Sequence, residues 1–131
     1  MSAISDAAIV AALRRQMTIA SARQVVTAGN LANLNTPGYR ARAVDFGKVL
    51  DSSLQAGARL AGTDARHLSG TTVVDPAVSE VADLPARRDG NTVQLERELL
   101  QMTRASGEFA AAQTALAAKF RLVRYAISES R

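Results

Sequence analysis

The sequence contains no cysteine and no tryptophan, and it has one histidine and three prolines among 131 residues. Without cysteine, the chain can form no disulfide, no thiolate metal site and no thiol nucleophile. The lone histidine, His67, lies in a loop-like stretch, and one histidine without cysteine argues against a zinc site. No run of residues approaches the roughly 18 apolar positions that a membrane-spanning helix needs. The absences argue against disulfide-stapled, zinc-binding and membrane-spanning proteins.

An excess of charge is also largely missing. Basic side chains outnumber acidic ones by 16 to 12. Residues 1–35 and residues 92–131 each carry a net charge of +2, whereas residues 36–91 carry seven charges of each sign. Because no dense block of lysine or arginine is present, the sequence does not favour binding to nucleic acid.

The N-terminal residues lack the order of features that a cleaved signal peptide has. A basic leader should precede the short apolar run, but Arg14 and Arg15 follow it. If the protein works outside the cytoplasm, we expect it to be exported by another route.

What the chain does contain is heptad spacing at both ends. Residues 5–34 have no proline, and their apolar positions alternate in steps of three and four, as in a coiled coil. The helix should stop at Thr36-Pro37-Gly38, because proline disfavours a helical conformation in the residue before it and glycine supplies the positive φ of a type II turn. The seam positions are Val10, Leu13, Met17, Ala20, Gln24, Thr27, Leu31 and Leu34.

A second long helix is predicted over residues 92–128. Asn91 with Gln94 resembles a capping box at its start. Its seam positions are Leu95, Leu99, Met102, Ser106, Phe109, Gln113, Leu116, Phe120, Val123 and Ile127. Two long helices at opposite ends of one short chain should pair, so we predict a mainly α fold in which they form an antiparallel coiled-coil hairpin. We expect the pairing to be made by Leu13, Met17, Leu31 and Leu34 against Leu99, Met102, Phe109, Leu116, Phe120 and Val123.

A two-helix hairpin leaves other apolar side chains of each helix uncovered. They are Ile9, Ile19, Val25 and Val26 on the first helix and Leu100 and Leu122 on the second. We expect these side chains to meet neighbouring copies or other partners.

The middle of the chain differs from its ends, because it holds all three prolines and six of the eight glycines. The apolar pattern predicts a short helix within residues 46–54 and a short strand at residues 71–74, with loop elsewhere. We therefore divide the chain into an N-terminal helix (residues 1–35), a central loop-rich insert (residues 36–91) and a C-terminal helix (residues 92–131).

No catalytic constellation or phosphate-binding glycine loop is present. Glu96 and Glu98 lie near the start of the second helix, where carboxylates complement the helix dipole. We expect no catalytic residue, no metal or cofactor site, no small-molecule substrate and no enzymatic activity.

The most informative motif lies where the first helix ends. Asn30 and Asn33 share one helix face, and asparagine side chains can bond the free carbonyls of a last turn or a neighbouring backbone. From composition alone, the motif is an asparagine-rich helix end with a Pro-Gly stop. The ten residues 30–39 (NLANLNTPGY) also closely resemble the N-terminal signature of the flagellar rod, hook and hook-associated protein family. Eight of the ten positions match that pattern, namely Asn30, Leu31, Ala32, Asn33, Thr36, Pro37, Gly38 and Tyr39.

Further stretches narrow the resemblance. Residues 40–46, residues 63–68 and residues 89–98, together with the short length of the chain, are similar to the small proximal rod proteins of the FlgB group. The resemblance implies a structural subunit of the proximal rod of the bacterial flagellar basal body, which polymerises with other axial proteins to transmit motor torque. It also implies that the two terminal helices form the tube-forming domain and that the eight signature residues fix the helix exit and contact the next subunit.

The resemblance implies a set of partners as well. They are other copies of the chain, other flagellar rod proteins, the MS ring with its rod-junction protein, and the flagellar type III export apparatus. The location would be the periplasmic rod, reached without a cleaved signal peptide. The alternatives are a closely related proximal rod protein, a helical-hairpin adaptor unrelated to flagella, and a nucleic-acid-binding protein suggested only by the high isoelectric point.

Overall fold

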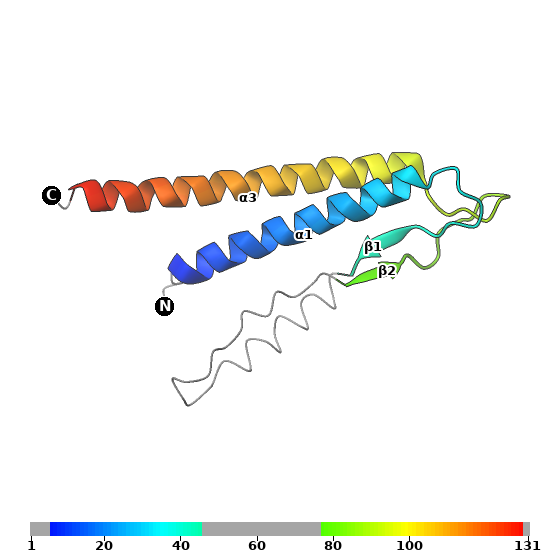
Figure 1. The fold of residues 1–131 in the computed structure, drawn as a ribbon, viewed down its shortest axis with the longest axis horizontal. Helices are drawn as coiled ribbons and strands as arrows, with labels where there is room; N and C mark the ends of the chain where they lie inside the picture. Colours follow the sequence, from blue (N-terminus) through cyan, green and yellow to red (C-terminus); the bar gives the residue numbers. More distant parts are fainter. Residues whose placement is uncertain (1–5, 46–76, 130–131) are drawn as a thin grey trace, which may run out of the picture.

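The chain folds into two long helices with a small sheet beside them. The computed structural model describes residues 6–45 and 77–129. The elements follow in the order α1 (Asp6–Ala32), β1 (Arg42–Val44), β2 (Val78–Glu80) and α3 (Leu95–Glu129). α1 and α3 run antiparallel along each other, and the sheet lies beside α1 (Figure 1). The predicted mainly α hairpin is therefore confirmed.

Both helices lie close to their expected bounds, but α1 ends before the proline stop. The amide of Leu34 bonds the carbonyl of Leu31, at 3.2 Å, and that of Asn33 bonds both Gly29 and Asn30. Hydrogen bonds from an amide to the carbonyl three residues earlier, as Leu34 and Asn33 make, tighten the last turn of a helix and end it. The helix is thus terminated by its own asparagine-rich sequence, and Pro37 lies in the turn that follows.

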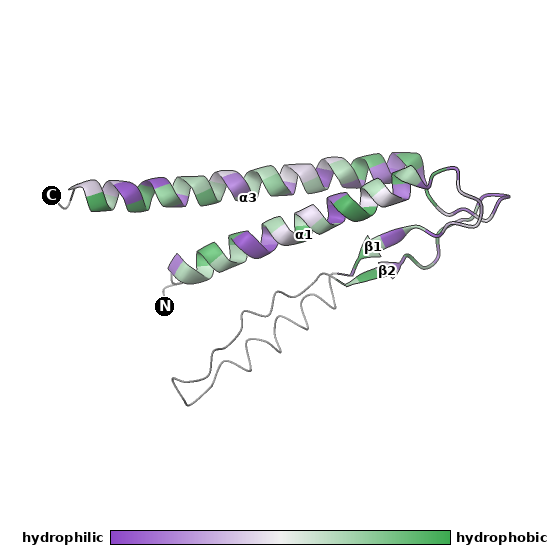
Figure 2. Cartoon of the chain, viewed as in Figure 1, coloured by the Kyte–Doolittle hydropathy of each residue, from purple (hydrophilic) through white to green (hydrophobic). Residues whose placement is uncertain are grey.

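The interface between the helices is narrow and built from small side chains. Ala20 on α1 and Ala105 and Ala112 on α3 are 0%, 1% and 5% exposed. On α3 the buried row also includes Glu98, so buried positions recur every seven residues, as a coiled coil requires. Figure 2 shows that hydrophobic residues are spread along both helices, including the far end of α3.

The two strands form an antiparallel ladder in which Ala43 pairs with Ser79. We expected loop at both strands, and that expectation was wrong. Each strand has only three residues, which is too short for an alternating pattern to be recognised. The short helix predicted within residues 46–54 and the strand predicted at residues 71–74 both lie outside the described residues.

Neither described helix combines the length and the apolarity that a membrane-crossing helix would need.

Candidate assembly site at the end of the first helix

Asn30 joins three elements of the fold. Its side chain is buried, and its amide nitrogen donates to the carbonyl of Arg42 at 2.8 Å, while its oxygen accepts from the amide of Arg42 at 3.0 Å. The side chain thus occupies the outer edge of β1 as a neighbouring strand would. The same nitrogen lies 2.9 Å from a carboxylate oxygen of Glu98 on α3, and the hydroxyl of Tyr39 donates to the Asn30 oxygen at 3.4 Å.

Glu98 is 4% exposed, so its carboxylate is held inside the junction between α1, β1 and α3. Burying a carboxylate without a partner is costly, and the hydrogen bond from Asn30 offsets part of that cost. The sequence analysis assigned Glu98 only to the helix dipole. Its place in the buried row of α3 shows that it also links the two helices.

Asn33 stabilises the last turn of α1. Its side-chain nitrogen donates to the carbonyl of Gly29 at 2.9 Å, and its oxygen accepts from the hydroxyl of Thr36 at 3.2 Å. The carbonyls of a last helical turn have no partner within the helix, and Asn33 supplies one of them.

Asn91, which is distant in sequence, caps the C-terminal end of α1. It is fully buried, and its side-chain nitrogen donates to the carbonyls of Asn33 at 2.9 Å, Leu34 at 3.2 Å and Thr36 at 2.8 Å. Its oxygen accepts from the amide of Val93 at 2.7 Å. Because an amide nitrogen carries two hydrogens, the three carbonyls share them.

The role predicted for Asn91 was therefore wrong. α3 begins at Leu95, four residues beyond Asn91, so no capping box forms there. An asparagine at this position could cap either helix by local rules. The folded chain brings it to the C-terminal end of α1, where several carbonyls need donors.

Two turns, at residues 36–39 and 87–90, contact each other beside this cap. The amide of Tyr39 bonds the carbonyl of Thr36 at 3.3 Å, and Gly38 between them has a φ of +70°, which confirms the predicted type II turn. The amide of Gly38 donates to Asp89 at 2.8 Å, and a Cβ on Gly90 would lie 3.4 Å from the Gly38 Cα. Gly90 has a φ of +78° and lets the two backbones approach closely.

The segments that follow the two turns stay together. The amide of Thr92 donates to the carbonyl of Tyr39 at 3.0 Å, and the hydroxyl of Thr92 accepts from the amide of Ala41 at 2.9 Å. The carbonyl of Ala41 in turn accepts from the amide of Val81 at 2.9 Å. One continuous set of bonds therefore links the exit of α1, the sheet and the approach to α3.

The signature residues divide into two groups in the folded chain. The side chains of Asn30, Asn33 and Tyr39 are buried or half-buried in this junction, and Leu31 is half-buried on α1. The exposed members are Ala32, Thr36, Pro37 and Gly38. The buried members shape the exit of α1 inside one subunit, and the exposed members form the surface that remains available to another molecule.

The seam residues of the two helices also divide. On α1, Leu13, Met17 and Leu31 are half-buried, and Leu34, just beyond the end of α1, is half-buried too. On α3, the half-buried members are Met102, Phe109 and Leu116. The others are Leu99, Phe120 and Val123, which are 51%, 52% and 43% exposed in the single chain.

The difference follows the position of the buried row on α3. The buried row at positions 98, 105 and 112 lies one residue before the row that contains Leu99. The prediction placed large aliphatic side chains inside, but a close contact has room for alanine and displaces larger side chains to the flank. Among the uncovered apolar residues that we expected, Ile9, Val25, Leu100 and Leu122 are indeed exposed, whereas Val26 is half-buried and Ile19 is buried.

The sequence analysis gave no role to Thr92 and assigned Asn91 only to a capping box at the second helix. The signal available was an Asp-Gly-Asn-Thr turn sequence, in which a buried asparagine cannot be told from a solvated one. Among the described residues, no group of three histidine, cysteine, aspartate or glutamate side chains could hold a metal ion.

Known proteins match this chain over the same elements. The family described as Flagella basal body rod protein matches residues 1–40, which include α1 and the signature. The flagellar basal body rod protein FlgB of Salmonella typhimurium is 34% identical over 123 residues, covering 85% of this chain and 88% of that protein. FlgB of Escherichia coli is 32% identical over the same coverage, and FlgB of Bacillus subtilis is 30% identical, covering 69% of this chain and 70% of that protein. The chain therefore belongs to the FlgB family of flagellar basal body rod proteins and is a structural subunit of the basal body rod.

Proposed function

We propose that this rod subunit polymerises with further copies of itself and with other rod proteins at the proximal end of the rod, where it transmits motor torque. In this proposal it contacts the MS ring and its rod-junction protein, and it leaves the cytoplasm through the flagellar type III export apparatus without a cleaved signal peptide. Residues 1–35 and 92–131 form the tube-forming domain, residues 36–91 form the insert, and the protein catalyses no reaction.

The observation that carries this proposal is the apolar surface of α3. The ion pair between Lys119 and Asp6, at 2.6 Å, marks where the described start of α1 meets α3. Beyond this ion pair α3 continues to Glu129, and so extends past Asp6, where the described part of α1 begins (Figure 1). The large apolar residues of α3 that are at least 43% exposed are Leu95, Leu99, Leu100, Phe120, Leu122, Val123, Tyr125 and Ile127.

These exposed apolar side chains of α3 would be stabilised by packing against another molecule. Burying one large apolar side chain stabilises a structure by about 1.5–3 kcal/mol relative to leaving it in water. An isolated stretch of about ten helical residues is marginal in water without packing. A rod subunit meets both requirements, because neighbouring helices in a tube cover the faces that a single hairpin leaves open.

The exposed signature residues suggest a second contact. Thr36, Pro37 and Gly38 form a turn that Asn91 and Asp89 hold rigidly from behind. A surface turn with a fixed backbone loses little conformational entropy on binding. We propose that this turn contacts the next subunit, whereas Asn30 acts inside its own subunit.

Electron microscopy of basal bodies tests the proposal. A strain without this gene should form the MS ring and lack the rod and everything beyond it, and the intact chain should restore the rod. Complete flagella in that strain would contradict the proposal and favour the helical-hairpin adaptor.

Point variants of α3 test the surface itself. Leu122→Gln and Ile127→Gln should leave the purified chain folded, because both side chains are already exposed, at 63% and 68%, yet they should fail to restore the rod. Arg121→Gln, an exposed polar neighbour, is the matched control and should restore it. Full restoration by both glutamine variants would show that this face stays uncovered in the rod.

A further inference from the structure

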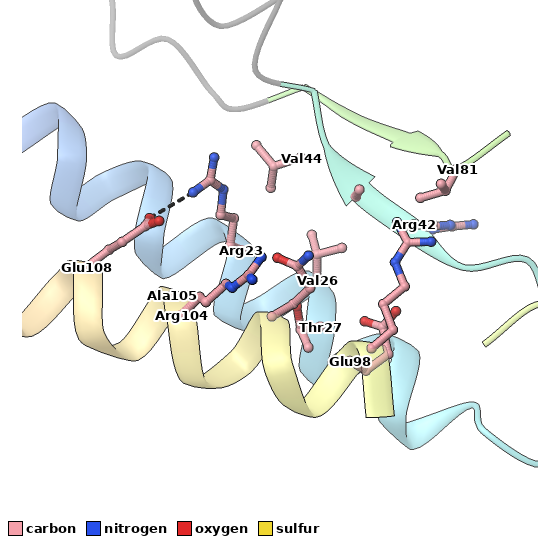
Figure 3. Close-up of a pocket in the computed structure, with 13 residues that line it drawn as sticks. Arg23, Val26, Thr27, Arg42, Val44, Val81, Glu98, Arg104, Ala105 and Glu108 are labelled. Atoms are coloured by element: carbon pink, nitrogen blue, oxygen red, sulfur yellow. Dashed lines mark hydrogen bonds and ion pairs between the residues drawn. The ribbon is translucent and has the colours of Figure 1, made fainter. Parts of the chain in front are cut away.

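A positively charged groove runs between the two helices and the sheet. Its volume is about 380 Å³, and it is bordered by α1, β1, α3 and the residue that follows β2 (Figure 3). The apolar part of its lining is Val26, Ala43, Val44, Val81 and Ala105. Four arginines and two glutamates make up its charged part, so the lining has a net charge of +2.

Both glutamates of the groove are already engaged. Glu108 forms an ion pair with Arg23 at 2.7 Å, and Glu98 accepts a hydrogen bond from Asn30. Within the described parts of the chain, the guanidinium groups of Arg97 and Arg104 have no hydrogen-bonding or ion-pair partner.

The guanidinium of Arg42 also has no hydrogen-bonding or ion-pair partner among the described residues. Glu80 stands opposite Arg42 in the ladder, but no ion pair joins them. The groove therefore combines an apolar lining with three arginines that have no partner among the described residues, and a segment that carries carboxylates and small apolar side chains would complement it.

The chain itself carries a segment of that chemistry. Residues 77–86 contain Glu80 and Asp83 and no lysine or arginine, so their net charge is −2. Both acidic residues are exposed, and Val78, the first residue of β2, is 48% exposed. Because the sheet has two strands, the outer edge of β2 has no strand beside it among the described residues.

We propose that the arginine groove of one copy receives the Glu80–Asp83 segment of a second copy. Within one chain these carboxylates form no ion pair with the groove, although Val81 beside them lines it. Since two different surfaces meet, each copy can both receive a segment and offer its own, and the contact can repeat from copy to copy. The inference rests on the proposal that copies of this chain contact one another, and it adds which surfaces meet.

The absence of cysteine allows a direct test on the full chain. Gln101→Cys places one thiol in the groove between Arg97 and Arg104, and Ala82→Cys places one in the acidic segment, so all charges are kept. The two purified variants, one of them with a size tag, are mixed and oxidised. We expect at least five times more mixed disulfide dimer than from the control pair of Gln101→Cys with Ala115→Cys, which replaces an exposed, uncharged residue outside the segment.

Charge reversal then tests the chemistry of the contact. Arg97→Glu with Arg104→Glu in the groove variant should reduce the cross-link to the control level, and Glu80→Arg with Asp83→Arg in the partner should restore it. A mixed dimer at the control level with unreversed charges would overturn the inference. If sedimentation still showed self-association in that case, the proposed polymerisation would stand and only the assignment of the surfaces would fall.

Discussion

Replacing Asn91 tests the junction between the two helices most directly. Its side chain is fully buried and makes one hydrogen bond through its oxygen, while its two amide hydrogens serve three carbonyls at the end of α1. At about 1 kcal/mol of net stabilisation for each bond, Asn91→Ala should lower the free energy of unfolding by about 3 kcal/mol.

Asn91→Asp separates hydrogen bonding from packing. The aspartate has nearly the same shape and keeps the oxygen that accepts from Val93, but it replaces the donating nitrogen with an acceptor. It would bury a carboxylate against three carbonyl oxygens, so we expect it to destabilise the fold at least as much as the alanine does.

Urea unfolding followed by far-ultraviolet circular dichroism measures both variants. A loss of about 3 kcal/mol corresponds to a midpoint lower by about 1–3 M urea for a chain of this size. Asn33→Ala, which removes the side-chain bond to Gly29, is the calibrating control and should cost about 1 kcal/mol. If Asn91→Asp unfolded within about 0.5 kcal/mol of the unmodified chain, the cap on α1 would not depend on its donor, and the reasoning would be refuted.

Three further predictions address the turn, the helix contact and the surface charges. Gly38→Val should cost about 1–3 kcal/mol in urea unfolding, because valine resists the φ of +70° although its Cβ would meet no atom within 4 Å; an unchanged midpoint would show that the turn can relax. Ala105→Leu should cost about 1–3 kcal/mol by overpacking the buried interface, whereas Ala115→Leu, exposed on the same helix, should change stability by less than about 0.5 kcal/mol. Equal costs at the two alanines would contradict the observed row. Arg23→Ala should cost no more than about 1 kcal/mol at low salt and almost nothing in concentrated salt, since its ion pair with Glu108 is partly exposed; a large cost that salt does not change would point to packing as its role.

Local sequence was sufficient to predict the two helices and the turn between α1 and the sheet. Heptad spacing and the absence of proline act within a few residues, and the positive φ of Gly38 follows from the Pro-Gly pair that precedes Tyr39. The signature also placed Asn30 and Asn33 near the helix end; Asn33 does bond a carbonyl of the last turn, and Asn30 bonds the backbone of the neighbouring β1. Each of these features depends on neighbours in the sequence, which is why periodicity and residue type could reveal it.

Tertiary structure alone decided which side chains meet across the molecule. Asn91 has the sequence context of a helix start, but it caps α1 because the fold brings two distant turns together at Gly38 and Gly90. The buried row of α3 is likewise set by how the two helices pack together, which buries Ala105 and leaves Leu99 exposed. A side chain's size and polarity are written in the sequence, whereas the space and the partners that it finds are set by elements far away along the chain.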